Sequence, residues 1–414
     1  MDTSRLLFYT CEYDSLLARF TRLLTSEDID VTECYNCISE LIAFGTKHCL
    51  SGNLWKLYIT YVMVYNENPY SVSCEIKGSE SESLDSLARN DFTILKTLFD
   101  YNIRSLPVDF DINNICDFGI ESDKDKIFNR RIRDRICELA NELEVSKNVT
   151  EFQEKVVAFY KTFGVGMLGL HKAFRLDDNG DIMPINGIAH VTFDDLVGYE
   201  IQKNKLISNT NAFVSGRRAN NCLLYGDSGT GKSTSIKAIT NQYYDKGLRV
   251  IEVYKHQFKY INKIIAYLKN RNYYFIIYMD DLSFEDFEIE YKYLKAVIEG
   301  GLEKKPDNIL IYATSNRRHL IKESFSDNLT NGDLHKNDSK EEKLSLADRF
   351  GVSIYYGAPT PKEFKEIVLS LRDKSGIDMS DEEILSEANK WELSHNGLSG
   401  RTARQFIDYI LGTK

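Results

Sequence analysis

The chain contains the stretch Gly226-Asp227-Ser228-Gly229-Thr230-Gly231-Lys232-Ser233, which is followed by Thr234. This stretch matches the complete spacing of a Walker A phosphate loop, and it follows residues 222–225, a short apolar run typical of a buried strand. The glycines let the backbone curl so that successive N–H groups point at an anion, and the composition after Ser233 predicts a helix whose positive N-terminus faces phosphates. A glycine-rich turn can match by chance, but the flanking strand and helix favour nucleotide binding by residues 226–234.

The overall composition predicts a protein of several globular domains. The chain has 414 residues, of which 43% are hydrophobic and 28% are charged. No apolar run approaches the roughly 20 residues of a membrane helix, and the first residues lack a basic segment followed by an apolar core. These features predict a cytoplasmic location without membrane contact. The formal charge of −10 disfavours a broad electrostatic grip on nucleic acid.

The eight cysteines are predicted to be reduced thiols, because no export signal is evident. One group of side chains suggests a metal site, and it comprises Cys34, Cys37, His48 and Cys49. The spacing of its second half is poor for a zinc finger. Cys34 and Cys37 also fit the apolar face of a helix together with Leu41. This helical face is the favoured interpretation, and metal binding stays open.

The periodicity of apolar residues predicts four parts: a mainly helical N-terminal domain (1–170), a linker with a hairpin (171–192), a nucleotide-binding domain (193–358) and a helical lid (359–414). Five apolar runs in the second half alternate with helical stretches, namely 222–225, 250–253, 274–279, 309–314 and 352–355. Apolar strands separated by helices indicate an α/β fold with a parallel sheet covered on both faces.

Two further motifs are interpreted as turns. Residues 164–169 match the GxGxxG pattern of dinucleotide-binding folds, but no strand clearly precedes them and no acidic ribose-binding residue follows at suitable spacing. Residues 177–181 carry three carboxylates, yet they lack the downstream Glu of a calcium loop. A tight hairpin turn is the better interpretation of the second motif.

An acidic pair follows the strand at 274–279, which is the form of a Walker B segment. The buried strand would deliver Asp280 to a magnesium ion opposite Ser233, and Asp281 would orient the attacking water. The strand at 309–314 leads to Asn316, whose amide is placed to contact the γ-phosphate or that water. Further on, Arg349 follows a polar stretch. An arginine at this position can be presented to the nucleotide of a neighbouring subunit.

The order of these motifs from residue 193 to the C-terminus resembles an AAA+ ATPase module. Four segments resemble more closely a bacterial AAA+ family catalogued as domain of unknown function 815, and they are residues 280–285, 313–320, 346–351 and 399–406. The resemblance covers a little over half of the chain. It implies ATP and Mg²⁺ as ligands, an AAA+ P-loop fold and a helical lid.

The resemblance also implies roles for residues that the motifs alone do not assign. Val197, Gly198 and Tyr199 look like the segment that packs on adenine. Lys232 would neutralise the β- and γ-phosphates, Ser233 would bind magnesium, and Asn316 would be the first sensor.

Three arginines complete the set that the resemblance implies. Arg349 looks like an arginine finger that acts in trans, which predicts a ring or filament of subunits and hydrolysis that depends on assembly. Arg401 looks like the second sensor on the lid, and Arg404 is the alternative for that role.

One departure from the AAA+ pattern concerns Asp281, because most modules place Glu there. The shorter side chain holds its carboxylate about one carbon–carbon bond further from the water, which predicts slow turnover. Asp-Asp pairs also occur in modules that resemble replication initiators and helicase loaders. Glu285 is a possible substitute for the missing Glu, but it is better assigned to the following turn.

The leading hypothesis is an ATPase that remodels a macromolecular partner, a protein rather than a nucleic acid. Residues 254–260 are aromatic and basic but lack the glycine of an unfoldase pore loop, so general remodelling is favoured over threading. A nucleotide-gated scaffold with little hydrolysis is the first alternative. Helicase-loader-like remodelling of nucleic acid is the second, since Lys255, Lys259 and Lys263 lie near one another.

Overall fold

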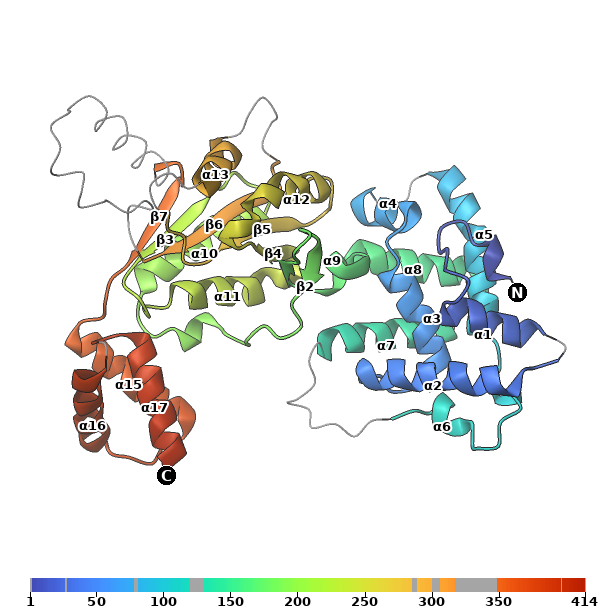
Figure 1. The fold of residues 1–414 in the computed structure, drawn as a ribbon, viewed down its shortest axis with the longest axis horizontal. Coiled ribbons are helices and arrows are strands. Elements are labelled where there is room, and N and C mark those ends of the chain that lie inside the picture. The colour runs from blue at the N-terminus through green and yellow to red at the C-terminus, as the bar shows by residue number, and fades with distance from the viewer. Residues whose placement is uncertain are drawn as a thin grey trace. The chain divides into compact units, whose positions relative to one another are not determined.

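The computed structural model describes residues 2–26, 28–77, 81–119, 130–284, 289–299, 306–316, 348–395 and 397–413. The chain divides into two compact units, Met1–His171 and Lys172–Lys414. The first is helical and the second holds a β-sheet (Figure 1). None of the described helices combines the length and apolar character needed to cross a bilayer.

The first unit packs its helices around a core of large aromatic side chains. The helices are α1 (Leu16–Thr25), α2 (Val31–Lys47), α3 (Leu54–Tyr65), α4 (Pro69–Lys77), α5 (Glu82–Phe99), α6 (Asn113–Cys116), α7 (Arg130–Glu144), α8 (Val149–Phe163) and α9 (Gly166–Leu170). Trp55 on α3 is fully buried, stacks on Phe20, and donates its indole N–H to the carbonyl of Leu98 at 2.7 Å. Because α3 also contacts α2, α5 and α7, it is the element around which this unit is built.

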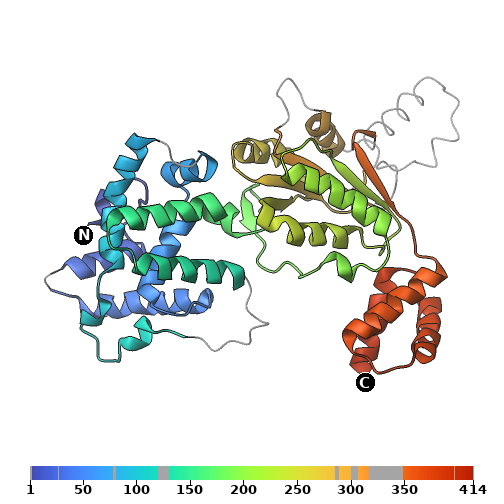
Figure 2. The same cartoon turned by 180° about the vertical axis from the view of Figure 1, so that it is seen from behind.

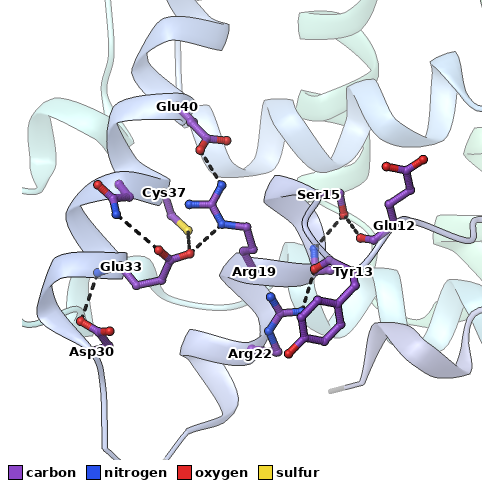
Figure 3. Close-up of polar contacts among 11 residues, drawn as sticks. Glu12, Tyr13, Ser15, Arg19, Arg22, Asp30, Glu33, Cys37 and Glu40 are labelled. Atoms are coloured by element: carbon purple, nitrogen blue, oxygen red, sulfur yellow. Dashed lines mark hydrogen bonds and ion pairs between the residues drawn. The ribbon is translucent and has the colours of Figure 1, made fainter.

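Polar side chains fasten α1 to α2 at the surface of this unit. Arg19 on α1 bonds two carboxylates of α2, Glu33 at 2.6 Å and Glu40 at 2.5 Å (Figure 3). Cys34 and Cys37 lie on the buried face of α2, where the Cys37 thiol contacts Glu33. Within the ranges that the structure describes, no group of three or more His, Cys, Asp or Glu side chains is arranged to hold a metal ion.

The second unit is built on one sheet whose strands run in the order β2-β1-β4-β5-β6-β3-β7. The strands are β1 (Ala173–Leu176), β2 (Ile182–Pro184), β3 (Cys222–Gly226), β4 (Leu248–Glu252), β5 (Tyr274–Met279), β6 (Ile309–Ser315) and β7 (Val352–Tyr356). Only β2 is antiparallel to its neighbour, and it pairs with β1 across the turn at 177–181. The central strands β5 and β6 are buried along almost their whole length, as expected of strands covered on both faces.

Helices cover both faces of the sheet, which confirms the predicted fold class (Figures 1 and 2). On one face lie α10 (Glu200–Val214) and α11 (Lys232–Tyr243), and toward the other lie α12 (Ile261–Leu268) and α13 (Ile289–Glu299). The α10–α11 side buries alternate residues of the strands, such as Leu224 and Ile276. This alternation follows from the two-residue period of a strand.

Three C-terminal helices follow β7 and pack on one another, and they are α15 (Pro361–Ser375), α16 (Asp381–Ser394) and α17 (Gly400–Thr413). We call them the lid. Capping boxes start the first two, since Thr360 pairs with Glu363 and Ser380 pairs with Glu383. Phe364 of α15 and Phe406 of α17 lie in the small core that these helices share.

Candidate nucleotide-binding site

The glycine-rich loop joins the end of β3 to the start of α11. Its backbone requires glycine at two points, since Gly226 has φ of 134° and Gly231 has φ of 93°. A Cβ atom on Gly226 would lie 2.1 Å from the carbonyl oxygen of Tyr356, and one on Gly231 would lie 2.3 Å from the Leu196 side chain. Any other residue at these two positions would therefore displace β7 or the segment before α10.

A cavity of about 720 Å³ opens in front of this loop. Most of the residues predicted from the sequence line it, namely Val197, Tyr199, Ser228, Gly229, Thr230, Gly231, Lys232, Ser233, Thr234, Asp280, Asp281, Asn316, Arg401 and Arg404. Its volume lies within the range of small-molecule sites, about 300–1,000 Å³. Gly198, Gly226, Asp227 and Arg349 are not among the lining residues.

Lys232 is the buried cation of the cavity, with 7% of its surface exposed. Its Nζ donates to the carbonyl oxygens of Gly226 at 2.9 Å and Asp227 at 2.6 Å. Burial lowers the pKa of Lys232, although the nearby carboxylates of Asp227, Asp281 and Asp280 act in the opposite direction. A bound anion would offset this cost of burial, because it favours the charged ammonium.

Asp280 follows β5 and faces Ser233 at the start of α11. Three hydroxyl groups donate to its Oδ1 atom: Thr314 at 2.5 Å, Tyr278 at 2.6 Å and Ser233 at 2.8 Å. Removal from water raises the pKa of Asp280, but these hydrogen bonds outweigh it and hold the pKa below its usual value. The carboxylate is therefore charged at neutral pH and lies beside the Ser233 hydroxyl.

Tyr278 and Thr314 were not identified from the sequence. Tyr278 lies two residues before Asp280, so strand alternation places both side chains on the same face and would have been a usable signal. Thr314 belongs to the adjacent strand β6, and its proximity depends on the pairing of Met279 with Ala313.

Asp281 and Asn316 form a second polar pair at the same edge of the sheet. The Asn316 amide donates to the Asp281 carboxylate at 2.7 Å. The Asp281 backbone adopts φ of 49°, in the left-handed region, and its N–H donates to the Thr314 hydroxyl at 2.9 Å. Asp281 therefore has a different set of partners from Asp280, whose carboxylate accepts from Ser233, Tyr278 and Thr314. Left-handed residues other than glycine are strained and often occur at functional sites.

Apolar and aromatic side chains form part of the cavity wall. Val197 and Tyr199 line it as the sequence predicts, and the Tyr199 hydroxyl donates to the carbonyl of Gly357 at 2.8 Å. Sequence reasoning missed several further lining residues, which are His190, Val191, Leu196, Ile367 and Leu371. Leu196 belongs to the segment before α10, and Ile367 and Leu371 belong to α15 of the lid, so both parts contribute apolar surface to the cavity.

The lid touches the glycine-rich loop directly. The backbone N–H of Arg401, in the first turn of α17, donates to the carbonyl of Gly229 at 3.2 Å. Ser399 caps the same helix through the N–H of Thr402 at 3.0 Å. Arg401 and Arg404, the two residues predicted for the second sensor, both line the cavity. The N-terminus of α17 adds positive potential at this place.

Arg349 lies outside this cavity, just before the edge strand β7. Its neighbour Phe350 is buried, with 2% of its surface exposed. Glu285 and residues 317–320, 346 and 347 of the resembling segments fall outside the described residues.

The topology and the site define the class of protein. The strand β3, which leads into the phosphate loop, lies between β6 and β7, and β6 separates it from β5, which leads into the acidic pair. This parallel core with its helical lid is an AAA+ P-loop module. A family model described as protein of unknown function DUF815 matches residues 170–414, and the chain belongs to this family. No curated protein matches the chain.

Solved structures that resemble the chain include RuvB from Thermotoga maritima. A mutant of RuvB aligns at 18% identity with a TM-score of 0.36, over 52% of this chain and 64% of that chain. The structure named as the Holliday junction branch migration motor RuvB aligns at 16% identity with a TM-score of 0.32, over 53% of this chain and 71% of that chain. This chain thus spans 64% of the length of the first of these structures.

Proposed function

We propose that the chain is an ATPase whose hydrolysis depends on self-association and drives the remodelling of a macromolecular partner. The observation that carries this proposal is the meeting of a buried lysine and two polar pairs in one cavity: Lys232, Ser233 with Asp280, and Asp281 with Asn316. A cation, a set of oxygen ligands and a water-orienting carboxylate are the parts that phosphoryl transfer requires.

The residues of the loop fit the phosphates of ATP. Backbone N–H groups at the start of α11 would point at the phosphates, and Lys232 would move from the loop carbonyls to their oxygens. The side chains of Ser233 and Asp280 fit magnesium, because hydroxyl and carboxylate oxygens are the ligands that this ion prefers. When bound, magnesium neutralises negative charge on the phosphates.

Asp281 is the proposed water-orienting residue, and Asn316 fixes its carboxylate. The water oxygen bonds to the γ-phosphorus while the bond from that atom to the bridging oxygen breaks. The electron pair leaves on ADP, and the proton of the water passes toward Asp281. The short side chain of Asp281 leaves a longer reach to the water, so turnover is slow.

Arg349 is the proposed finger that acts on the nucleotide of a neighbouring subunit. Its position outside the cavity of its own subunit supports a role in trans. Such an arginine contributes about 10³–10⁵ in rate by stabilising charge on the transferring phosphoryl group. Self-association into a ring or filament follows from this role.

A protein partner is favoured over nucleic acid because three neighbouring lysines already make contacts within the protein. Lys263 pairs with Asp181 at 2.7 Å, and the ammonium groups of Lys255 and Lys259 lie over the rings of Phe284 and Tyr260. Each of the three lysines thus has a partner within the protein, which a nucleic-acid phosphate would have to displace.

A mixing experiment tests the assembly-dependent ATPase. Lys232→Ala weakens nucleotide binding and disables hydrolysis at its own site, and Arg349→Ala removes the finger, so each variant alone is expected to be nearly inactive. A mixed assembly places an intact Arg349 beside an intact Lys232 site, and we expect it to regain a substantial fraction of the wild-type hydrolysis. Equal inactivity of the mixture and of the separate variants would contradict a finger in trans. ATP binding without hydrolysis in the wild type would instead favour a nucleotide-gated scaffold.

A further inference from the structure

Residues 189–191 form a tight turn that the phosphate-binding motifs do not explain. The N–H of Val191 donates to the carbonyl of Ala189 at 2.8 Å, which places His190 at the apex of a three-residue turn. His190 is exposed, and both His190 and Val191 line the cavity in front of the glycine-rich loop. We call residues 189–191 the apical turn.

Asn241 holds the apical turn in place. Its Nδ2 group donates to the carbonyl of Ala189 at 3.1 Å and to the carbonyl of Val191 at 2.8 Å. These two carbonyls flank His190. The Oδ1 atom of Asn241 accepts a hydrogen bond from the Lys172 ammonium. Both hydrogens of the amide are therefore used, and the orientation of its dipole is fixed.

Asn241 links the apical turn to the helix that begins with the phosphate-loop lysine. It lies on α11, the helix that begins with Lys232 directly after the glycine-rich loop. The apical turn is therefore fastened to the element that carries the phosphate-binding residues. A displacement of α11 would move Lys232 and His190 together.

The cavity that His190 lines suits a ligand with a planar, partly polar ring. Val191, Val197, Ile367 and Leu371 line the same cavity as His190 and supply apolar surface on which the faces of such a ring can pack. The imidazole of His190 has one ring nitrogen that can donate and one that can accept, and its ring can stack. Small-molecule sites combine apolar walls with a few placed polar groups in this way.

We propose that the apical turn recognises the nucleobase: His190 contacts the base, and Asn241 is a positioning residue that holds His190 at the cavity. This inference rests on the proposed function, because it requires that the cavity takes a nucleotide. It adds a base-reading contact that lies outside Val197, Gly198 and Tyr199.

Affinities for ATP and for tripolyphosphate, which lacks the base and the ribose, test the proposal in the full chain. His190→Ala removes the ring. Asn241→Asp keeps the size and the Lys172 contact of the side chain but replaces both donors with an acceptor. For each variant we expect the Kd for ATP to rise about tenfold, since one or two hydrogen bonds or a stacked ring are lost. The Kd for tripolyphosphate should stay within about twofold of the wild type.

Two matched variants outside the cavity serve as controls. His256→Ala and Asn262→Asp make the same chemical changes away from the apical turn, and they should leave both affinities unchanged. An equal loss of affinity for both ligands in Asn241→Asp would overturn the positioning role, because it would mark a general disturbance of α11. Unchanged ATP affinity in His190→Ala would overturn base contact. A wild-type chain that binds neither ligand would refute the proposed function itself, which is a separate result.

Discussion

Two glycine-rich segments of this chain each contain the start of a helix, yet one opens on a cavity and the other faces carboxylates of the protein itself. Residues 226–233 lead into α11 and open on a cavity that contains Lys232. Residues 164–169 include the start of α9 at Gly166, and the N–H of Val165, directly before that helix, donates to the buried carboxylate of Glu75 at 2.9 Å. A Cβ atom on Gly166 would lie 2.3 Å from an oxygen of Glu67.

The comparison shows what a glycine-rich turn does and does not determine. In both segments the backbone N–H groups before a helix attract negative charge. At α9 the protein supplies that charge itself, from residues far away in the sequence. At α11 the neighbouring side chains leave room for an anion from outside. The turn therefore predicts an anion site, and the distant side chains decide whether a ligand can occupy it.

The largest expected effect follows from replacing Lys232, the lysine of the segment at 226–233. In Lys232→Ala we expect ATP hydrolysis to fall about a thousandfold and ATP affinity to fall at least about tenfold, because the loop loses its one buried cation. Steady-state hydrolysis and calorimetric titration with ATP measure the two effects. The control is Lys237→Ala, which changes an exposed lysine on the same helix. Equal activities of Lys232→Ala and Lys237→Ala would contradict the role of Lys232 in ATP binding and hydrolysis.

Neutralisation of the water-orienting carboxylate should separate binding from chemistry. In Asp281→Asn we expect hydrolysis to fall about a hundredfold, because proton acceptance is lost, while the Kd for ATP changes by less than about threefold. Single-turnover hydrolysis and nucleotide titration check the two parts. An unchanged rate would show that another group orients the water.

Removal of the internal carboxylate should affect only the helical unit. In Glu75→Ala the buried N–H of Val165 loses its acceptor, and we expect the free energy of unfolding of that unit to fall by about 1–3 kcal/mol. ATP affinity should not change. Denaturant unfolding followed by hydrogen exchange in α4 and α9 measures the effect, with the exposed Glu154→Ala as the control. A loss of ATP affinity in Glu75→Ala would contradict the separation of the two segments.

The smallest expected effect is at the surface of the helical unit and depends on pH. Hydrogen bonding to Arg19 lowers the pKa of Glu33 below its usual value of 4.5. The pair therefore stabilises the folded state above about pH 4.5, and this contribution is lost as the pH falls through the lower pKa of the folded state. In Glu33→Gln we expect a loss of less than about 1 kcal/mol at pH 7 and no difference at pH 2. Thermal unfolding at both pH values checks this, and an equal difference at both would contradict an ionic origin.

The sequence predicted those parts of the fold and site that depend on local pattern. The glycine spacing, the apolar strands and the acidic pair are local, so the loop at 226–233 and the positions of Asp280 and Asn316 could be placed beforehand. Thr314 contacts Asp280 only because β6 lies beside β5, and Asn241 bonds Ala189 of the apical turn from 52 residues further along the chain. No local signal marked these contacts. The roles of Arg349, Arg401 and Arg404 are still predictions.

Steady-state ATP hydrolysis as a function of protein concentration tests the central claim most directly. We expect the rate per subunit to rise with concentration and then reach a plateau, because each site needs Arg349 from a neighbour. Under the same conditions, Lys232→Ala and Arg349→Ala should remain near background. A wild-type rate per subunit that is constant over the whole concentration range, with Arg349→Ala equally active, would contradict an ATPase that works only when assembled.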